Sequence, residues 1–598
     1  MSRKETGLLV FALLLMMFWP MIVNRIWPPK PLPPEAIAAG SGTNAIVHAE
    51  RPGATPVIRA QAPPPPTPED LARYREARPT AVLENDLMRL EIVAEGGGIR
   101  NSTLKGQKAV GDDPIVLNQH GEGPLFELRF GDNRDLRPWQ VVSSDNRVTT
   151  LKATPIEGLE ITKRFDIGED YGSTVTITFS NATATAMEVP KVAINCGTAA
   201  PVHETDQQLY IGADWYDGAQ FKAQQVTDFG KSGFLFMTFR EARASFDVPR
   251  PLEWVTSRNQ FFVTLIDPRE RKFDGLLLKQ VDLPRFRPGQ ATQPIGMLAL
   301  GGIAPIRLDP GATTTVTFSN YTGPREYWRL KGLGEEKRRI MNFGMFGWVS
   351  VILLNLMNSL HKVTHSYGLA IILMVVIIRA VFWPLQTKAN RTMKQMQSLK
   401  PELEKIQKQY KDQPEKLHAE MLNLYQTYGV SPLGGCLPML VQLPVFFGFY
   451  SMLLSAVELR HQSFLWIADL SRPDTIWHIP GIDFPLNLLP LLMGATSIWQ
   501  THVTPMSGME KSQAMMMKFM PLIFVAICYN FSSALALYWT VQNLIAVFQT
   551  YRNLAQPAPK LEKKKRPKGR WAMLMEQARQ AAEAEKDARR RKKKSHGS

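Results

Sequence analysis

Cysteine is scarce in this chain. Only three occur in 598 residues, namely Cys196, Cys436 and Cys528. The last two lie inside apolar runs, so Cys196 stands alone in the long polar region that precedes residue 340. No intrachain disulfide is therefore expected to hold that region together.

Motifs for nucleotide, nucleophilic and metal chemistry are also missing. The sequence contains no Walker-type phosphate loop, no nucleophile elbow and no histidine–cysteine cluster with the spacing of a metal site. Between residues 79 and 335 the only histidines are His120 and His203. We therefore expect no enzyme activity, no catalytic residue, no cofactor and no metal ion, and ATP-driven pumping is disfavoured.

Long apolar runs are absent from residues 24–340. A run at Gly7–Val23 follows Arg3 and Lys4 and lacks a small-residue cleavage site, which is typical of an uncleaved signal anchor. A transmembrane helix needs roughly 20 apolar residues, and five further runs follow residue 340. Six spans are therefore predicted, at 1–24, 366–385 (TM2), 434–457 (TM3), 484–500 (TM4), 514–532 (TM5) and 534–550 (TM6).

The distribution of basic residues predicts the orientation of these spans. Residues 386–433 hold eight Lys/Arg against five Asp/Glu, and the tail 551–598 holds sixteen against five. Residues 458–483 hold two against four. By the positive-inside bias, 386–433, the short loop 501–513 and the tail are cytoplasmic, whereas 458–483 and the region before TM2 lie outside.

The outside region has three parts. Residues 25–78 are rich in Pro and Ala without hydrophobic periodicity, which predicts an extended tether. Residues 79–335 contain short alternating strands separated by turn residues, which is typical of a large antiparallel β-sandwich. Residues 343–362 carry apolar side chains at helical spacing, with Ser350, Asn355 and Asn358 interrupting the other face, and predict an amphipathic interfacial helix. The strands are expected at 87–93, 174–180, 234–239, 261–266 and 314–319.

Arg379 is a lone charge in the apolar run Tyr367–Leu385. A guanidinium inside a bilayer costs roughly 2.5–3.5 kcal/mol on insertion scales, and it cannot shed its proton. Two interpretations remain open. The side chain snorkels to the nearer interface, which lies about 9 Å away along the helix, or it has a function within the membrane.

Polar residues recur on the other predicted spans, among them Gln442, Gln500, Gln542 and Asn543. Such groups often only bond one helix to another. Together with Arg379 they are also suited to line a wet cavity. No acid–histidine relay accompanies Arg379, which disfavours proton-coupled transport.

The segment 386–433 is predicted to be a cytoplasmic helical hairpin. Apolar residues recur every three or four positions, from Met393 and Met396 to Tyr410 in one arm and from Leu417 to Tyr428 in the other. These stripes either pack against each other or expose methionines to varied apolar partners. The basic tail, which includes Lys592, suits ribosomal RNA and anionic lipid equally well.

Four features together resemble the YidC/Oxa/Alb family of insertases, in its Gram-negative form with a large periplasmic domain. They are Arg379 in TM2, SPLGGCLPMLVQLPVF at 431–446, VELR at 457–460 and FSSALALYWTVQNL at 531–544. The likeness runs through residues 340–550. It implies a polytopic α-helical inner-membrane protein with six transmembrane helices, five of them an insertase core, joined to a periplasmic all-β sandwich.

The resemblance also implies a function and a site. In this family a polar groove opens to the cytoplasm and to lipid, is closed outside, and contains an arginine that Arg379 matches. Tyr538 and Trp539 match aromatics of the sixth span that contact clients. The sequence departs from some relatives at Val375, where they have threonine. The family's external sandwich resembles galactose-mutarotase folds and is largely dispensable for insertion.

We therefore expect a membrane protein insertase and chaperone whose partners are nascent membrane proteins, the Sec translocon, the ribosome and the lipid bilayer. The predicted client groove comprises Arg379, Gln442, Gln500, Tyr538 and Trp539. The predicted cytoplasmic contacts to client or ribosome are Met393, Met396, Lys405 and Lys592.

Two other classes of protein are alternatives. A secondary transporter would need inverted repeats and half-helix sites, and the spans show no internal symmetry. An outward-facing sugar-binding or envelope-assembly protein would place the function in residues 79–335.

Overall fold

The computed structural model describes most of the chain between residues 57 and 557. The described residues are 57–59, 62–109, 113–131, 133–203, 206–230, 232–234, 237–240, 242–286, 293–411, 413–430, 437–479, 484–504 and 511–557. The predicted anchor 1–24, the tether up to residue 56, Cys436 and Lys592 lie outside them. The chain divides into two compact units, Met1–Gly344 with Leu454–His461, and Met345–Leu453 with Gln462–Ser598.

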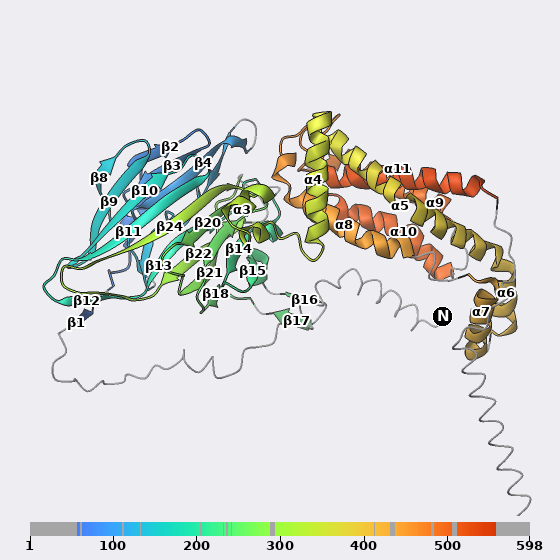
Figure 1. Ribbon diagram of the computed structural model, residues 1–598, viewed down its shortest axis with the longest axis horizontal. Coiled ribbons are helices and arrows are strands. Elements are labelled where there is room, and N and C mark those ends of the chain that lie inside the picture. Colours follow the sequence, from blue (N-terminus) through green and yellow to red (C-terminus); the bar gives the residue numbers. More distant parts are fainter. Residues whose placement is uncertain are drawn as a thin grey trace, which may run out of the picture. The chain divides into compact units, whose positions relative to one another are not determined.

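A nine-stranded antiparallel sheet is the largest element of the first, β-rich unit (Figure 1). Its strands in spatial order are β15 (Phe221–Gln225), β14 (Gly212–Tyr216), β19 (Trp254–Arg258), β20 (Phe262–Pro268), β24 (Thr313–Pro324), β11 (Gly172–Asn181), β10 (Leu159–Ile167), β9 (Val148–Ile156) and β8 (Gln140–Ser144). Each strand pairs antiparallel with its neighbours.

Smaller sheets complete this unit. The six-stranded sheet has the order β18 (Ser245–Val248), β21 (Gly275–Asp282), β22 (Ile295–Ile303), β13 (Val192–Ala199), β6 (Leu128–Phe130) and β7 (Asn133–Arg134). The four-stranded sheet is β2 (Ala81–Glu84), β3 (Met88–Val93), β4 (Gly98–Lys108) and β5 (Pro114–Leu117). A further sheet joins β1 (Val57–Arg59), β12 (Ala186–Val189) and β23 (Ile306–Leu308). The short helices are α2 (Pro68–Glu76), η2 (Gln208–Tyr210), η3 (Val226–Phe229), α3 (Tyr327–Leu333), η4 (Lys337–Met341) and η6 (Val457–Leu459).

The core of the unit lies between the nine-stranded and six-stranded sheets. Strand β11 reads Thr-Val-Thr-Ile-Thr-Phe, and its burial alternates accordingly, because successive side chains of a strand point to opposite faces. Val175 pairs with Phe318 of β24 across the sheet. Phe318 in turn packs against Phe126 and Phe273, with ring centroids 5.8 and 6.0 Å apart. These buried rings pack together in one apolar core.

Two predictions for this unit are wrong in detail. The apolar stretch 234–239 is not one strand, because β16 (Ser232–Phe234) and β17 (Met237–Arg240) pair antiparallel as a hairpin. Strand-forming residues favour a strand but do not fix where it ends. The predicted tether 25–78 is too long, because α2 lies within it. Thr67 and Asp70 form a reciprocal capping box there, and Tyr74 is buried.

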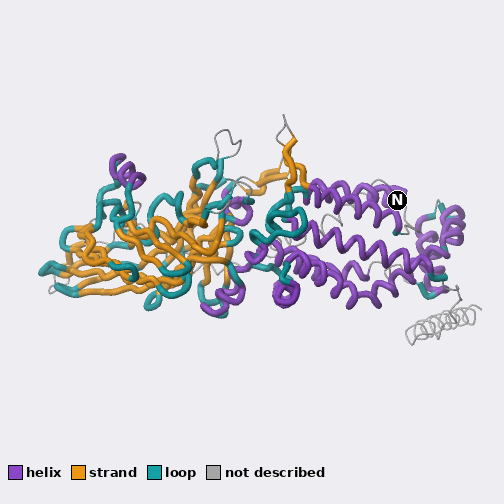
Figure 2. The backbone as a smooth tube through the Cα atoms, turned by 90° about the horizontal axis from the view of Figure 1, so that it is seen from above, coloured by secondary structure: helices purple, strands orange, loops and turns teal. Residues whose placement is uncertain are grey.

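The second unit is a group of helices (Figures 1 and 2). The helices after residue 344 are α4 (Gly347–Thr364), α5 (Tyr367–Ser398), α6 (Lys400–Gln409), α7 (Pro414–Tyr428), α8 (Leu437–Ser455), α9 (Leu488–Val503), α10 (Lys511–Cys528) and α11 (Ser533–Ala555). A hairpin of β25 (Thr475–Ile479) and β26 (Phe484–Asn487) precedes α9. The β-rich domain and the helical core expected from the sequence are confirmed.

Helix α5 is longer than the predicted span 366–385. Its 32 residues rise about 48 Å at about 1.5 Å per residue, and they continue through Pro384 into the predicted hairpin. The helix then stops at Leu399, and α6 begins with Pro401 in its first turn. Proline lacks the N–H that would continue the helix. The stripe predicted as one arm from Met393 to Tyr410 is therefore divided between two helices.

Candidate functional site

Helix α5 carries the candidate site. Among the residues that the structure describes, it is the one helix that is both long and apolar enough to cross a membrane. Two shorter apolar helices, Val441–Ser455 and Met515–Cys528, lie within α8 and α10. Arg379 lies thirteen residues into α5, after an uninterrupted apolar segment.

The Arg379 guanidinium is bonded to two glutamines of α11. Its Nε donates to the side-chain Oε1 of Gln542 at 3.0 Å, and Nη2 donates to the Gln542 main-chain carbonyl at 3.1 Å. Nη1 donates to the Oε1 of Gln549 at 3.3 Å. No described carboxylate lies within ion-pair distance of Arg379. The positive charge is thus solvated by neutral groups and is not neutralised.

A small cavity adjoins the guanidinium. It holds about 20 Å³, which is room for about one water molecule. Three helices, α5, α8 and α11, supply its walls. The lining residues are Ile378, Arg379, Phe382, Leu385, Gln386, Gln442, Val445, Tyr538, Gln542 and Gln549. The structure thus brings together three of the five predicted groove residues, Arg379, Gln442 and Tyr538.

Tyr538 and Trp539 are neighbours in sequence but contact different helices. Tyr538 is 2% exposed and stacks on Phe449 of α8, with ring centroids 4.3 Å apart. Trp539 is half-buried and contacts Phe446 of α8 at 5.1 Å and Phe524 of α10 at 4.4 Å. Tyr538 therefore forms part of the cavity wall, whereas the Trp539 ring lies between α8 and α10.

Gln500 does not line the cavity. Helix α9, which carries it, packs on the face of α11 that presents Asn543. The Asn543 Nδ2 donates to the Ser497 Oγ at 2.7 Å and to the Thr496 Oγ1 at 3.2 Å. Consecutive residues of a helix point about 100° apart, so Gln542 and Asn543 bond to different neighbours. Thr496 and Ser497 therefore bond α9 to α11.

The predicted hairpin packs mainly on itself. Leu399, Leu403 and Val430 form a buried cluster, and Met396 and Met421 pack against it. Met393 is half-buried. Lys405 is exposed and pairs with Glu402 at 3.0 Å. The stripes therefore contact each other, and Met396 is a packing residue in this structure.

Sequence reasoning missed Gln549 and did not select Gln542 for the site. The signal was present in the spacing. Tyr538, Gln542 and Gln549 are separated by four and seven positions, which places them on one face of a helix. Polar residues at that spacing in an apolar helix share one neighbour, and here the neighbour is Arg379.

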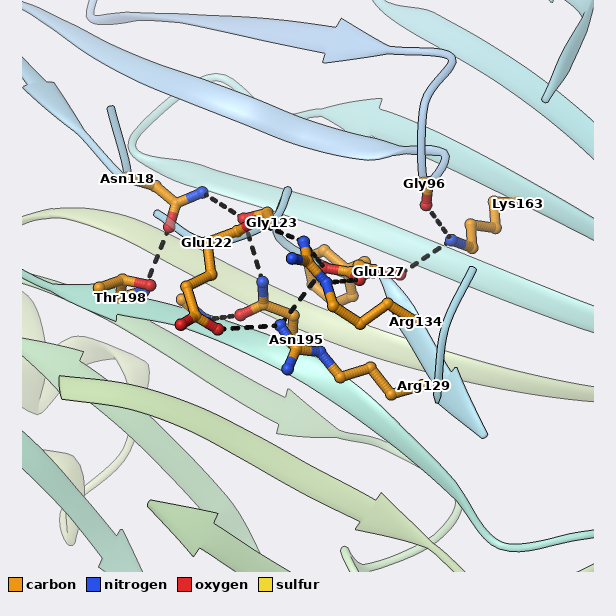
Figure 3. A network of polar contacts seen from close by, with 12 residues as sticks. Gly96, Asn118, Glu122, Gly123, Glu127, Arg129, Arg134, Lys163, Asn195 and Thr198 are labelled. Atoms are coloured by element: carbon orange, nitrogen blue, oxygen red, sulfur yellow. Dashed lines mark hydrogen bonds and ion pairs between the residues drawn. The ribbon is translucent and has the colours of Figure 1, made fainter. Parts of the chain in front are cut away.

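The β-rich unit contains a separate buried polar network, drawn in Figure 3. Lys163 is fully buried and donates to the carbonyls of Gly96, Gly97 and Phe126 at 3.2, 2.7 and 2.9 Å. Its ammonium also lies 4.1 Å from the centre of the Trp139 ring. Burial lowers the pKa of Lys163 to about 7. These contacts tie β10 to two loops and form a structural junction.

A larger cavity of about 470 Å³ also lies in this unit. Its walls include His120, Asn118 and Arg258. Burial lowers the pKa of His120, and the Nε of Arg258 is paired with buried Asp214 at 2.8 Å. Among the described residues no group of three or more potential metal ligands occurs. The cavity offers hydrogen-bonding groups, but its one histidine has no paired acid–base partner in the described lining.

Comparison with known proteins yields two family models that match adjacent parts of the chain. The model described as YidC periplasmic domain matches residues 80–356, and the model described as 60Kd inner membrane protein matches residues 359–557. Together they cover most of the chain.

Curated relatives cover the same parts. A protein of Syntrophobacter fumaroxidans, named membrane protein insertase YidC, is 29% identical over 92% of this chain and 99% of the relative. One of Nitratidesulfovibrio vulgaris (strain Miyazaki F), with the same name, is 39% identical over 41% of this chain and 45% of the relative. A solved structure, titled as an active YidC insertase with its first transmembrane domain resolved, is 18% identical over 80% of this chain and 95% of that one, with a TM-score of 0.32.

Proposed function

Because the chain belongs to the YidC family of membrane protein insertases, we propose that it inserts nascent inner-membrane proteins through a polar site centred on Arg379. The observation that carries this proposal is that, in the part of the chain that the structure describes, the hydrogen-bond partners of Arg379 are the neutral residues Gln542 and Gln549. A guanidinium with neutral acceptors keeps its full charge in a medium of low dielectric, where it attracts acidic and polar segments strongly.

The proposed topology has six spans with the tail in the cytoplasm. The predicted anchor 1–24 is followed by spans formed by α5, α8, α9, α10 and α11, and α4 lies in the interface. Residues 25–78 and 79–335 and the loop 458–483 are periplasmic. Residues 386–433, 501–513 and 551–598 are cytoplasmic. Exposed large apolar side chains along α10, such as Phe519, Ile523 and Ile527, support contact with lipid.

In the proposed mechanism a client displaces the glutamines. The translocated segment of the client brings carboxylate or amide groups to Arg379 and takes over its hydrogen bonds. The side-chain amides of Gln542 and Gln549 are neutral, so exchanging them for a charged acceptor is favourable, since charge-assisted hydrogen bonds are the stronger ones. The cavity at Arg379 must widen for this exchange, because it now holds about 20 Å³.

The client's apolar helix takes a different path. Trp539 contacts both α8 and α10, at Phe446 and Phe524, so it lies beside Arg379's cavity and faces the seam between those helices. We propose that the apolar helix leaves along this seam into lipid. The driving free energy is the client's own hydrophobicity, about 0.8 kcal/mol per buried CH₂, together with the membrane potential, and not nucleotide hydrolysis.

The remaining partners belong to the same proposal. The cytoplasmic end of α5 with Met393, the hairpin α6–α7 with Lys405, and the basic tail with Lys592 receive the nascent chain at the ribosome. The protein acts alone or beside the Sec translocon and helps clients fold as a chaperone. The hairpin's self-packing implies that it opens, or offers its outer surface, when a client arrives.

Site-specific photocrosslinking tests the proposal. A photoreactive phenylalanine replaces Trp539, and a stalled nascent chain with one transmembrane segment is supplied. We expect a crosslink from position 539. The matched control is Trp499 of α9, which is 47% exposed and bonded to Tyr551 at 3.3 Å, away from the cavity lining. Equal crosslinking from both positions would contradict the proposed path.

A second experiment isolates the charge. Purified protein is reconstituted into vesicles without nucleotide, and insertion of clients with acidic and with uncharged translocated segments is compared. Arg379→Ala is expected to reduce insertion of the acidic clients, and Arg379→Lys to retain part of it. Unchanged insertion of every client by Arg379→Ala would remove the proposed role.

A further inference from the structure

The loop Gln462–Asn487 uses its polar groups to hold helix ends together. Asp474 is 5% exposed, and its Oδ2 accepts from Trp466 Nε1 at 3.1 Å and from the main-chain N–H of Leu489 at 2.7 Å. The Nδ2 of Asn487 donates to the carbonyl of Tyr529 at 2.9 Å. The loop is thus tied to the start of α9 and to the turn between α10 and α11.

The outer surface of the same loop is apolar. We define the aromatic edge as the exposed large apolar residues of this loop, Leu465 (75% exposed), Trp466 (44%), Ile476 (49%), Trp477 (56%) and Phe484 (45%). The described charged side chains of this loop, Asp469, Arg472 and Asp474, do not share this exposure. Asp469 and Arg472 pair with each other, with side chains 12% and 22% exposed. Several exposed large apolar residues within one loop indicate an interaction surface.

Leu465 adds a second observation. Its φ is +53°, in the left-handed region that favours glycine and asparagine. A leucine there is strained because its Cβ lies too close to the following carbonyl oxygen, and its side chain is 75% exposed. The strained backbone thus coincides with an apolar side chain that points outward.

The position of the aromatic edge along the chain indicates what it contacts, because the edge lies next to the ends of apolar helices. Phe484 lies four residues before Leu488, where the apolar helix α9 begins. Its ring stacks on Tyr529, 5.2 Å away, just beyond the last residue of α10. Near its end the same helix exposes the apolar side chains of Ile523 and Ile527. Both helix ends lie at the same face of the proposed membrane core.

We propose that the aromatic edge inserts into the headgroup region of the outer leaflet and anchors the outer ends of α9, α10 and α11 to lipid. This inference rests on the proposed topology. Tryptophan is the residue best suited to that depth, because its ring is apolar while its N–H remains polar. The low exposure of Asp469, Arg472 and Asp474 keeps these three charges, among the residues that the structure describes, away from the proposed lipid contact.

Depth-dependent fluorescence quenching tests the inference. The full-length protein, with Cys196, Cys436 and Cys528 replaced by alanine, receives one cysteine by Trp477→Cys or Leu465→Cys and an environment-sensitive label. It is reconstituted into vesicles of phosphatidylethanolamine and phosphatidylglycerol. Nitroxide lipids carry the quencher near the headgroup or near the chain end, and iodide quenches from the aqueous phase. We expect headgroup-proximal nitroxide to quench about threefold more than chain-end nitroxide, since interfacial aromatics lie at headgroup level.

Two control positions separate the possible outcomes. Val142→Cys, on exposed strand β8 of the β-rich unit, is expected to be quenched by iodide only. Ile498→Cys, exposed on α9, is expected to be quenched by the deeper nitroxide. Iodide quenching at 465 and 477 equal to that at 142 overturns the inference. Protection from every quencher also overturns it, because a protein surface then covers the edge. Absence of lipid quenching at 498 contradicts the proposed topology itself.

Discussion

Arg379 donates from two of its nitrogens to a single residue, Gln542, through both the side-chain Oε1 and the main-chain carbonyl. A helix carbonyl already accepts from the N–H four residues on, so the second bond uses its remaining lone pair. The arginine thereby fixes the depth and rotation of α11 relative to α5. A carboxylate at position 542 would therefore neutralise the charge of Arg379 while the arginine itself stays in place.

Gln542→Glu is predicted to suppress insertion of clients with acidic translocated segments. The new carboxylate would lie about 3.0 Å from the Arg379 Nε and would neutralise it. Hydrogen bonds to charged groups contribute about 1.5–3 kcal/mol, so client binding is expected to fall roughly tenfold or more, while clients with uncharged segments are little affected. Vesicle insertion assays measure both. Gln500→Glu is the matched control, because Gln500 does not line the cavity.

Lys163 is predicted to make the stability of the β-rich unit depend on pH. Its pKa is about 7 in the folded protein and about 10.4 in an unfolded chain. Between these values the unfolded state binds more protons, so the free energy of unfolding rises with pH, by up to about 1.4 kcal/mol per pH unit.

Pulse proteolysis of the full-length protein in micelles, from pH 6 to pH 10, measures this dependence. Lys163→Met is expected to flatten the curve above pH 7. The variant is also expected to be less stable overall, because carbonyls of Gly96, Gly97 and Phe126 lose their donor. Parallel curves for the two proteins would show that Lys163 does not titrate in this range.

Lys394 is predicted to protect the last turn of α11. Its ammonium donates to the carbonyls of Asn553, Leu554 and Gln556, the last two at 3.2 and 2.7 Å. A cation at a helix C-terminus contributes about 0.3–1 kcal/mol. Lys394→Met should therefore raise hydrogen exchange at residues 553–556 by about two- to fivefold. Lys388→Met, at an exposed position on the same helix, should leave this exchange unchanged.

Gly368→Ala is predicted to destabilise the helical unit. A Cβ at this position would lie 2.1 Å from the Cγ of Phe464, so the ring must move. Overpacking of this kind costs about 1–3 kcal/mol. In Phe464→Ala the ring is gone, and Gly368→Ala should then cost little. A double-mutant cycle of thermal unfolding checks this, and additive effects would contradict it.

The division into a β-rich unit and a helical unit follows from patterns that act over many residues. Strand β11 alternates threonine with valine, isoleucine and phenylalanine, and this alternation is dictated by burial of one sheet face. The second hairpin arm, α7, likewise follows from apolar spacing, whereas the first is divided between α5 and α6. Helix α2 escaped notice because its signal is local. Thr67, Pro68 and Asp70 define its start, whereas the proline-rich composition around it argued for a tether.

The sequence predicted several residues of the candidate site, but it did not predict which residues hydrogen-bond to Arg379. Arg379 is conspicuous as a lone charge, and Tyr538 and Trp539 came from resemblance. Which glutamine meets the arginine depends on the rotation of each helix about its axis. Gln549 and Gln500 were equally plausible by composition, and only the packing of α9 against Asn543 separates them. The rotation of a helix about its axis is set by its tertiary contacts. The sequence of one apolar helix does not determine those contacts.

Residues Leu454–His461 belong to the β-rich unit although more than a hundred residues separate them from the rest of it. The Nη2 of Arg460 donates to the carbonyl of Lys108 at 2.7 Å, and its guanidinium lies about 5 Å from the rings of Phe261 and Phe262. Deletion of residues 79–335 would thus leave Arg460 without the carbonyl and the aromatic rings that it contacts. A deletion variant that keeps residues 457–460 (VELR) therefore combines two changes, namely loss of the domain and loss of the contacts of Arg460. A clean dissection of the periplasmic domain must remove its outlying strip of sequence as well.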